Sequence, residues 1–209
     1  MPADLTVILC TYNRASFLPR ALKSLRDQTE HGFRVLVVDD GSTDETLSVL
    51  AEAVAKFAST EVCSLGENGG IGAARNAALG RARTEWVTFL DSDDAYAPHH
   101  LAEYFRARET HPEVDLFHGS AEVIGDRWVR DKNDPTKKVD IADCIIGGTF
   151  LLRREKALAL GGFPEDCYGD DSFFFAQARE AGWKIHFLGP TGYRYHRDHE
   201  SSLTKTTSI

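Results

Sequence analysis

The sequence is short of the features that mark membrane, exported and metal-knuckle proteins. No window approaches the roughly 18 uninterrupted apolar residues of a membrane-spanning helix, and Met1-Pro2-Ala3-Asp4 does not open a basic and then apolar export signal. The four cysteines include no C-x-x-C pair, which argues against a zinc knuckle or a short disulfide framework. We therefore expect a cytoplasmic protein with reduced thiols.

Positive charge is also scarce. Lysine and arginine number 24 against 32 aspartate and glutamate residues, so the net charge is -8 at pH 7. This balance offers no broad basic surface to a polyphosphate backbone, and we expect no nucleic-acid partner. With 209 residues and 42% hydrophobic content, the chain can bury one core, and we expect one domain over residues 1–209.

The first half of the chain alternates short apolar runs with segments of helical periodicity. Repeated β-α units of this length predict an α/β fold with a mostly parallel sheet and helices on both faces. Ser42 and Glu45 fit a capping box that starts the helix after the second strand. The predicted strands of this half cover residues 5–10, 33–38, 61–65 and 86–90.

The second half is less regular. Helices are predicted from Pro98 to Glu109, from Arg153 to Leu160 and from Asp170 to Ala181. Strands are predicted over 114–118 and 184–188. The segment 126–140 is rich in charge and is predicted to be a mobile loop, and 201–209 a frayed tail.

Two of the predicted strands end in acids. Asp39 and Asp40 follow the second strand, and Asp91, Asp93 and Asp94 follow the fourth. Ligands of open α/β sheets bind beyond the carboxyl ends of the strands, so these acids indicate one site. Carboxylates suit Mg²⁺ or Mn²⁺, which share coordination with substrate phosphates. The alternative is a solvated turn in which the acids cap the following backbone.

Two further segments carry candidate chemistry. Gly69 to Asn76 joins a glycine turn to a helix, where backbone N–H groups and Arg75 can meet phosphate oxygens. Asp170 and Asp171 are followed by Ser172 and then by three phenylalanines, and burial beside a like charge raises a carboxyl pKa toward that of a base. Negative charge that stabilises a helix N-terminus is the alternative for this pair.

In this order, the segments resemble the family 2 glycosyltransferases of the GT-A fold, which use nucleotide-activated sugars. The match covers nearly the whole chain, although Cys10 stands where proline is common and Asp170-Asp171 where the family has Glu-Asp. The resemblance implies a nucleotide-binding half over residues 1–95 and an acceptor-side half over residues 96–200.

The resemblance also implies roles for individual residues. Asp171 would be the catalytic base, with Asp170 as the other candidate, and Gly148 and Thr149 would form the acceptor-side wall. The implied metal ligands are Asp93 and Asp91, with His199 or His196 as a further ligand. The implied nucleotide-binding residues are Thr11, Tyr12, Asn13, Arg14, Asp40, Asn68, Gly69, Arg75, Asp91 and Ser92.

The reaction that the resemblance implies is direct attack of an acceptor hydroxyl with inversion at the anomeric carbon. The donor would be a nucleotide diphosphate sugar, most commonly linked to UDP, although GDP or TDP fits the same motifs. The cofactor would be Mn²⁺ or Mg²⁺, and the acceptor would be a saccharide or lipid-linked. A lipid-linked acceptor would require peripheral docking at the membrane or a partner protein. Homo-oligomers are compatible with the sequence.

Two other functions remain open at this stage. A nucleotide-sugar-binding module without catalysis fits the same motifs, because the weakest match is at Asp170-Asp171. A sugar nucleotidyltransferase needs a basic segment near the amino terminus to hold a triphosphate, and only Arg14 and Arg20 are available there.

Overall fold

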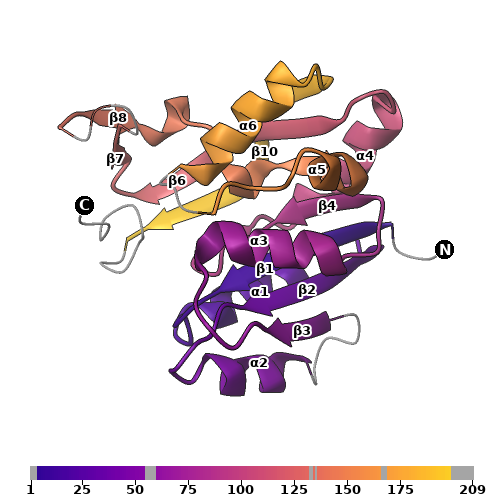
Figure 1. Cartoon of the computed structure of the whole chain (residues 1–209). Helices are drawn as coiled ribbons and strands as arrows, with labels where there is room; N and C mark the ends of the chain where they lie inside the picture. Colours follow the sequence, from indigo (N-terminus) through magenta and orange to yellow (C-terminus); the bar gives the residue numbers. More distant parts are fainter. Residues whose placement is uncertain (1–3, 55–59, 132–133, 135, 166–168, 199–209) are drawn as a thin grey trace.

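An eight-stranded sheet forms the centre of the protein, in the strand order β3-β2-β1-β4-β9-β6-β10-β5 (Figure 1). The structure, a computed structural model, describes residues 4–54, 60–131, 134, 136–165 and 169–198. The strands of the sheet are β1 (Leu5–Thr11), β2 (Phe33–Asp39), β3 (Thr60–Ser64), β4 (Trp86–Phe89), β5 (Ala95–Tyr96), β6 (Leu116–Gly125), β9 (Leu151–Arg153) and β10 (Ile185–Arg197).

Most strand pairs are parallel, as the sequence predicts. β3, β2, β1 and β4 pair in parallel with one another, and so do β6 and β10. The short strand β9 lies antiparallel between β4 and β6, and β5 lies antiparallel beside β10. The sheet therefore consists of two parallel parts joined through one reversed strand.

Helices cover both faces of this sheet. Successive residues of its strands point to opposite faces, so each face carries apolar side chains that a helix can bury. In β1, Leu5, Val7 and Leu9 join one core cluster, whereas Ile8 and Cys10 join the other. The first core includes α1 (Leu18–Arg26), α2 (Thr46–Val54) and α4 (His100–Thr110). The second includes α3 (Gly70–Arg81), α5 (Arg154–Ala159) and α6 (Asp170–Glu180).

The second half corrects three of the predicted elements. β6 extends to Gly125 beyond the predicted strand 114–118, and β10 runs for 13 residues through Gly189, Pro190 and Gly192, beyond the predicted strand 184–188. Irregular register on either side of Pro190 accommodates these residues within the strand. The predicted mobile loop contains a hairpin of β7 (Trp128–Arg130) and β8 (Lys138–Asp140), with Val129 buried.

The predicted capping box is also wrong. The hydroxyl of Ser42 accepts a hydrogen bond from the backbone N–H of Asn13, 2.9 Å away, and not from the first turn of α2. Asp44 takes that place, since its carboxylate accepts from the N–H of Thr46 at 2.9 Å. The segment after β2 is thus fastened to the segment after β1.

Two predictions concern residues outside the described part of the chain, namely the frayed tail over 201–209 and the candidate metal ligand His199. None of the helices in the described ranges has both the length and the apolar character that crossing a bilayer needs.

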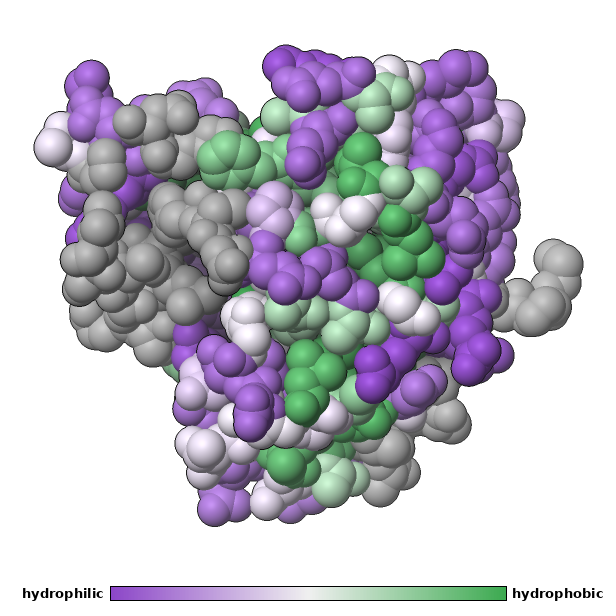
Figure 2. Space-filling view, in the orientation of Figure 1, coloured by the Kyte–Doolittle hydropathy of each residue, from purple (hydrophilic) through white to green (hydrophobic). Residues whose placement is uncertain are grey.

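Two short 3-10 helices, η1 (Ile141–Asp143) and η2 (Gly147–Thr149), lead from the hairpin to β9. In Figure 2, apolar residues are exposed over the middle of the face shown, and hydrophilic residues cover its right-hand side.

Candidate active site

A cleft of about 1340 Å³ opens beyond the carboxyl ends of β1, β2 and β4. Thr11 ends β1, Asp40 follows β2 and Asp91 follows β4, so the parallel strands deliver these three side chains to one edge. Helices α3 and α6 and the β7–β8 hairpin contribute the remaining walls.

The cleft gathers most of the predicted site residues. Asn13, Gly69, Gly148 and Thr149 do not line it, and His199 lies outside the described part of the chain. The predicted residues that line it are Thr11, Tyr12, Arg14, Asp40, Asn68, Arg75, Asp91, Ser92, Asp93, Asp170, Asp171 and His196.

The turn after β1 divides its residues between the cleft and the fold. Asn13 has a positive φ of 51°, and its side-chain oxygen accepts from the N–H of Thr43 at 2.8 Å. Asn13 therefore fastens the turn after β2 and does not line the cleft as predicted. Thr11 lines the cleft, and its buried Oγ1 has no hydrogen-bond partner among the described residues. A buried hydroxyl in this state suits a bound ligand.

Both acids after β2 are engaged inside the protein. The buried carboxylate of Asp39 accepts from the hydroxyl of Ser64 at 3.0 Å. Asp40 accepts from the side chain of Asn68 and from the N–H groups of Gly69 and Gly70, at 2.8–2.9 Å. Asp40 thus fixes the N-terminus of α3 from the cleft side, a role that Gly69 shares through its backbone.

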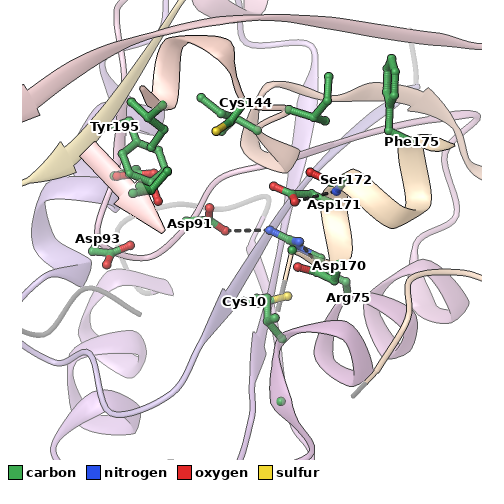
Figure 3. Close-up of a pocket in the computed structure, with 18 of the residues that line it drawn as sticks. Cys10, Arg75, Asp91, Asp93, Cys144, Asp170, Asp171, Ser172, Phe175 and Tyr195 are labelled. Carbon is green, nitrogen blue, oxygen red and sulfur yellow. Dashed lines mark hydrogen bonds and ion pairs between the residues drawn. The ribbon is translucent and has the colours of Figure 1, made fainter. Parts of the chain in front are cut away.

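Arg75 on α3 links the two acidic clusters. Its guanidinium donates to Asp170 at 2.6 Å and to Asp91 at 3.2 Å, and its side chain is almost fully buried (Figure 3). Burial alone would lower the pKa of Arg75, but the charges of Asp170 and Asp91 outweigh burial and raise it. Arg75 is therefore permanently charged at the centre of the cleft.

The two acids of α6 differ in their surroundings. Asp170 is paired with Arg75, whereas the carboxylate of Asp171 accepts from the N–H groups of Gly147 and Ser172, at 2.9 and 2.7 Å. Burial, followed by the neighbouring charge of Asp170, raises the pKa of Asp171 to about 6. A carboxyl with this pKa can accept a proton near neutral pH.

The acids after β4 form a second crowded group. Asp94 is buried and accepts from the hydroxyl of Tyr193 at 2.6 Å and from the N–H of His196 at 2.7 Å. Burial and the charges of Asp93 and Asp91 raise the pKa of Asp94 well above its usual value. Extra positive charge near this group would be stabilising.

No ready-made metal centre accompanies this crowding within the described ranges. There, no three or more His, Cys, Asp or Glu side chains are arranged to hold an ion. Figure 3 shows Asp93 apart from the cluster of Arg75, Asp91, Asp170 and Asp171. His196 lines the cleft, with Nδ1 at 3.5 Å from the carboxylate of Asp198.

Gly148 and Thr149, which are predicted to form the acceptor-side wall, are buried and do not line the cleft. Thr149 is fully buried, and its carbonyl accepts from the hydroxyl of Tyr104 at 2.8 Å. A Cβ on Gly148 would lie 2.2 Å from the hydroxyl oxygen of Tyr193, so only glycine allows Tyr193 to reach Asp94. Gly148 therefore leaves room for Tyr193, and Thr149 holds the hydroxyl of Tyr104.

Sequence reasoning missed several aromatic and basic residues of the cleft. Trp128 and Arg130 on β7 and Tyr195 on β10 line it, and the hydroxyl of Tyr193 donates to Asp94. The sequence signal for β7 is the short run Trp128-Val129-Arg130, of which the structure buries Val129. Three residues are too few to distinguish a strand from a loop.

Comparison with known proteins identifies relatives of this site and fold. An uncharacterized glycosyltransferase of Nostoc sp. is 31% identical over 145 residues, which are 68% of this chain and 45% of the relative. An uncharacterized glycosyltransferase of Haemophilus influenzae is 26% identical over 186 residues, 87% of this chain and 74% of the relative. The chain spans about half the length of the first relatives that it matches.

Solved structures give the same result for the fold. The structure of residues 1–349 of S. aureus TarS with UDP-GlcNAc matches with a TM-score of 0.80 and 26% identity, over 100% of this chain and 62% of that one. The mannosyltransferase PcManGT from Pyrobaculum calidifontis, solved with GDP-Man and Mn²⁺, matches with a TM-score of 0.74 and 25% identity, over 93% and 57%. The predicted GT-A fold is confirmed.

The family model described as "Glycosyl transferase family 2" matches residues 6–199, which include nearly the whole cleft. The chain therefore belongs to glycosyl transferase family 2.

Proposed function

We propose that this chain transfers a sugar from a nucleotide diphosphate sugar to an acceptor hydroxyl, with inversion and with help from a divalent cation. The observation that carries the proposal is Asp171, a carboxyl with a pKa raised to about 6, in the same cleft as Arg75 and Asp91. This combination supplies a proton acceptor beside a site for a charged leaving group.

The donor nucleotide would bind at the end of β1. The unpartnered Oγ1 of Thr11, the half-exposed ring of Tyr12 and the guanidinium of Arg14 all line that end of the cleft. We propose a UDP-linked donor, the kind that is bound in the TarS structure with UDP-GlcNAc, and a GDP-linked donor, as in PcManGT, is the alternative. Asp40 would act mainly through the backbone that it holds, since its carboxylate already accepts three hydrogen bonds within the protein.

The residues after β4 fit a divalent cation in charge and ligand type. Asp93 and Asp91 are oxygen donors that line the cleft, and their charges add to burial in raising the pKa of the neighbouring Asp94. Because the described residues contain no complete ligand set, donor phosphate oxygens would supply the remaining ligands. When bound, such a cation neutralises charge on the diphosphate.

The transfer step would use Asp171 as the base. The oxygen of the acceptor hydroxyl forms a bond to the anomeric carbon, the bond to the diphosphate oxygen breaks, and the hydroxyl proton passes to Asp171. Attack on the side opposite the leaving group inverts the anomeric centre. Asp170 is less suited to this role, because its carboxylate is held by Arg75 at 2.6 Å. Arg75 keeps its charge throughout and faces the departing diphosphate.

The test is release of nucleoside diphosphate from a panel of nucleotide sugars, without any acceptor, in the presence of Mn²⁺ or Mg²⁺. We expect slow hydrolysis of at least one donor, loss of it with a chelator, and a decrease of about tenfold or more in Asp93→Ala. Asp143→Ala is the matched control, because Asp143 is an exposed carboxylate of the same cleft.

Release that is unaffected by the chelator and by Asp93→Ala would refute the metal role. Tight donor binding in calorimetry without any turnover would favour a binding module over an enzyme.

A further inference from the structure

Trp128 is the exposed tryptophan of the cleft. Its side chain is 49% exposed, although it stands on a strand and lines the cleft, whereas Trp86 is buried in the core. An indole is a large apolar ring system with a negatively polarised face. Covering it with another apolar surface lowers the free energy substantially. The exposed ring is therefore a surface that a ligand can use.

The backbone that carries this ring is held in place. Val129 and Ile141 anchor the hairpin in the core, at 6% and 3% exposure. The buried guanidinium of Arg197 donates to the carbonyl oxygens of Asp126 and Trp128, at 2.8 and 2.6 Å. Anchors on both sides of Trp128 hold the backbone from which its side chain projects, and a held backbone binds a ligand with a smaller loss of entropy.

A carboxylate accompanies the ring on the same face of the hairpin. Asp140 is the cross-strand partner of Trp128 in the β7–β8 register, and directly opposite residues share a face. The N–H of Ala142, 3.0 Å away, and then Arg127 lower the pKa of Asp140. Asp140 is thus an ionised hydrogen-bond acceptor beside an aromatic face.

The hairpin leads directly to the proposed base. From Asp140 the chain passes through η1 to Gly147, whose N–H donates to Asp171 at 2.9 Å. Trp128, Asp140 and Asp171 all line the cleft, which places the aromatic ring, the acceptor carboxylate and the base in one cavity.

We propose that Trp128 and Asp140 form a subsite for one pyranose ring of a saccharide acceptor, which rests on the proposed transferase function. The C–H groups on one face of a pyranose lie flat against the indole, and a hydroxyl at the ring edge donates to the carboxylate of Asp140. The same ring would be held near Asp171, where another of its hydroxyls is the nucleophile.

The surrounding charges favour a neutral sugar over a polyol phosphate. Arg130 lines this side of the cleft together with Asp131 and Asp143, and Asp140 is paired with Arg127, so the lining has no excess of positive charge to hold a phosphate group. The same balance disfavours an anionic lipid surface as the partner of Trp128. Residues 126–140 carry four acids against five bases, and Asp140 and Asp134 are paired with Arg127 and Lys137. This near balance gives little attraction to anionic lipid.

Saccharide binding is measured by calorimetry on the full chain in the presence of UDP and Mn²⁺, with cellobiose, maltose, lactose, N,N′-diacetylchitobiose and sn-glycerol 3-phosphate as probes. We expect at least one disaccharide to bind and glycerol phosphate not to bind. Trp128→Ala should weaken the disaccharide by about tenfold or more, as for other aromatic anchors. Trp128→Phe should retain part of the affinity, and Asp140→Asn should lose less than Trp128→Ala.

Phe187→Ala is the matched control, because Phe187 is 58% exposed on β10 and does not line the cleft. Donor hydrolysis without acceptor is measured separately in the wild type and in Phe187→Ala, so failure of the transferase proposal shows in that assay and failure of the subsite shows in saccharide binding. The subsite is refuted if no disaccharide binds, or if Trp128→Ala binds as tightly as the wild type. It is also refuted if the wild type sediments with phosphatidylglycerol vesicles and Trp128→Ala does not.

Discussion

The two sides of the cleft hold their acids differently. At the end of β2, the carboxylates of Asp39 and Asp40 are buried and accept hydrogen bonds from β3 and from the N-terminus of α3. After β4 and at the start of α6, Asp94 and Asp171 lie next to other carboxyls, and burial and these neighbouring charges raise their pKa values.

This difference shows how one cleft can combine a rigid side with a reactive side. Acids whose lone pairs are satisfied position the backbone for a donor and contribute to stability. An acid held close to another acid is less stable when ionised, and it accepts protons more readily as a result. Arg75 joins the two sides, since it pairs with Asp91 after β4 and with Asp170 on α6.

Asp171→Asn should give the largest effect and break the reactive side alone. An amide of the same shape cannot accept the hydroxyl proton, so we expect transfer to fall by about 10²–10⁴-fold, with donor affinity nearly unchanged. Glu180→Gln on the same helix is the control, because Glu180 is exposed and outside the cleft. Transfer rates with the best acceptor and donor affinity from calorimetry check this prediction. Equal rates for both variants would remove Asp171 from the chemistry.

Arg75→Met should damage both sides, through stability. The substitution leaves Asp170 and Asp91 without their shared cation, and breaking a buried ion pair of this kind costs about 3–5 kcal/mol. Arg75→Lys restores the charge without the two-pronged geometry and should recover part of the loss. The free energy of unfolding in urea is the measurement, with Arg179→Met as an exposed control in the same cleft. A decrease in the free energy of unfolding of less than about 1 kcal/mol would show that the ion pairs of Arg75 contribute little to holding the two sides together.

The two parallel parts of the sheet also differ in how well the sequence predicts them. Short parallel units place each strand, helix and turn next to one another in the chain, so local periodicity predicts them. The strands β1 and β2, and the gathering of Asp40, Arg75 and Asp91 at one edge, follow from that pattern. The hydrogen bonds of Asp40 do not, because they depend on how closely α3 approaches the end of β2.

The other part depends on pairs of strands that are distant in the sequence. β10 continues through Pro190 only because β6 pairs with it to Gly125, and β7 is fixed by Arg197 from β10. Neither partner is visible in a local window. The choice between Asp170 and Asp171 has the same cause, since it is Arg75, on another helix, that distinguishes the two carboxyls.

The smallest expected effect is on stability as a function of pH, and it tests whether the reactive side is a burden on the fold. The pKa of Asp171 rises from 3.8 to about 6 on folding, because of burial and Asp170. Between these values the folded state keeps a proton that the unfolded state releases. The contribution of Asp171 to stability is therefore complete below about pH 4 and is lost as the pH rises through about 6.

Asparagine at position 171 resembles the protonated carboxyl at every pH, so Asp171→Asn should match the wild type near pH 4 and exceed its stability by about 1–3 kcal/mol at pH 7.5. Urea denaturation of both proteins across this range measures the difference, in which the other titrating groups cancel. Glu180→Gln should show no such divergence, because its carboxyl is exposed. If Asp171→Asn were less stable than the wild type at pH 7.5, the N–H groups of Gly147 and Ser172 would outweigh the repulsion from Asp170. Asp171 would then be a satisfied acid like Asp40, and the contrast between the two sides of the cleft would disappear.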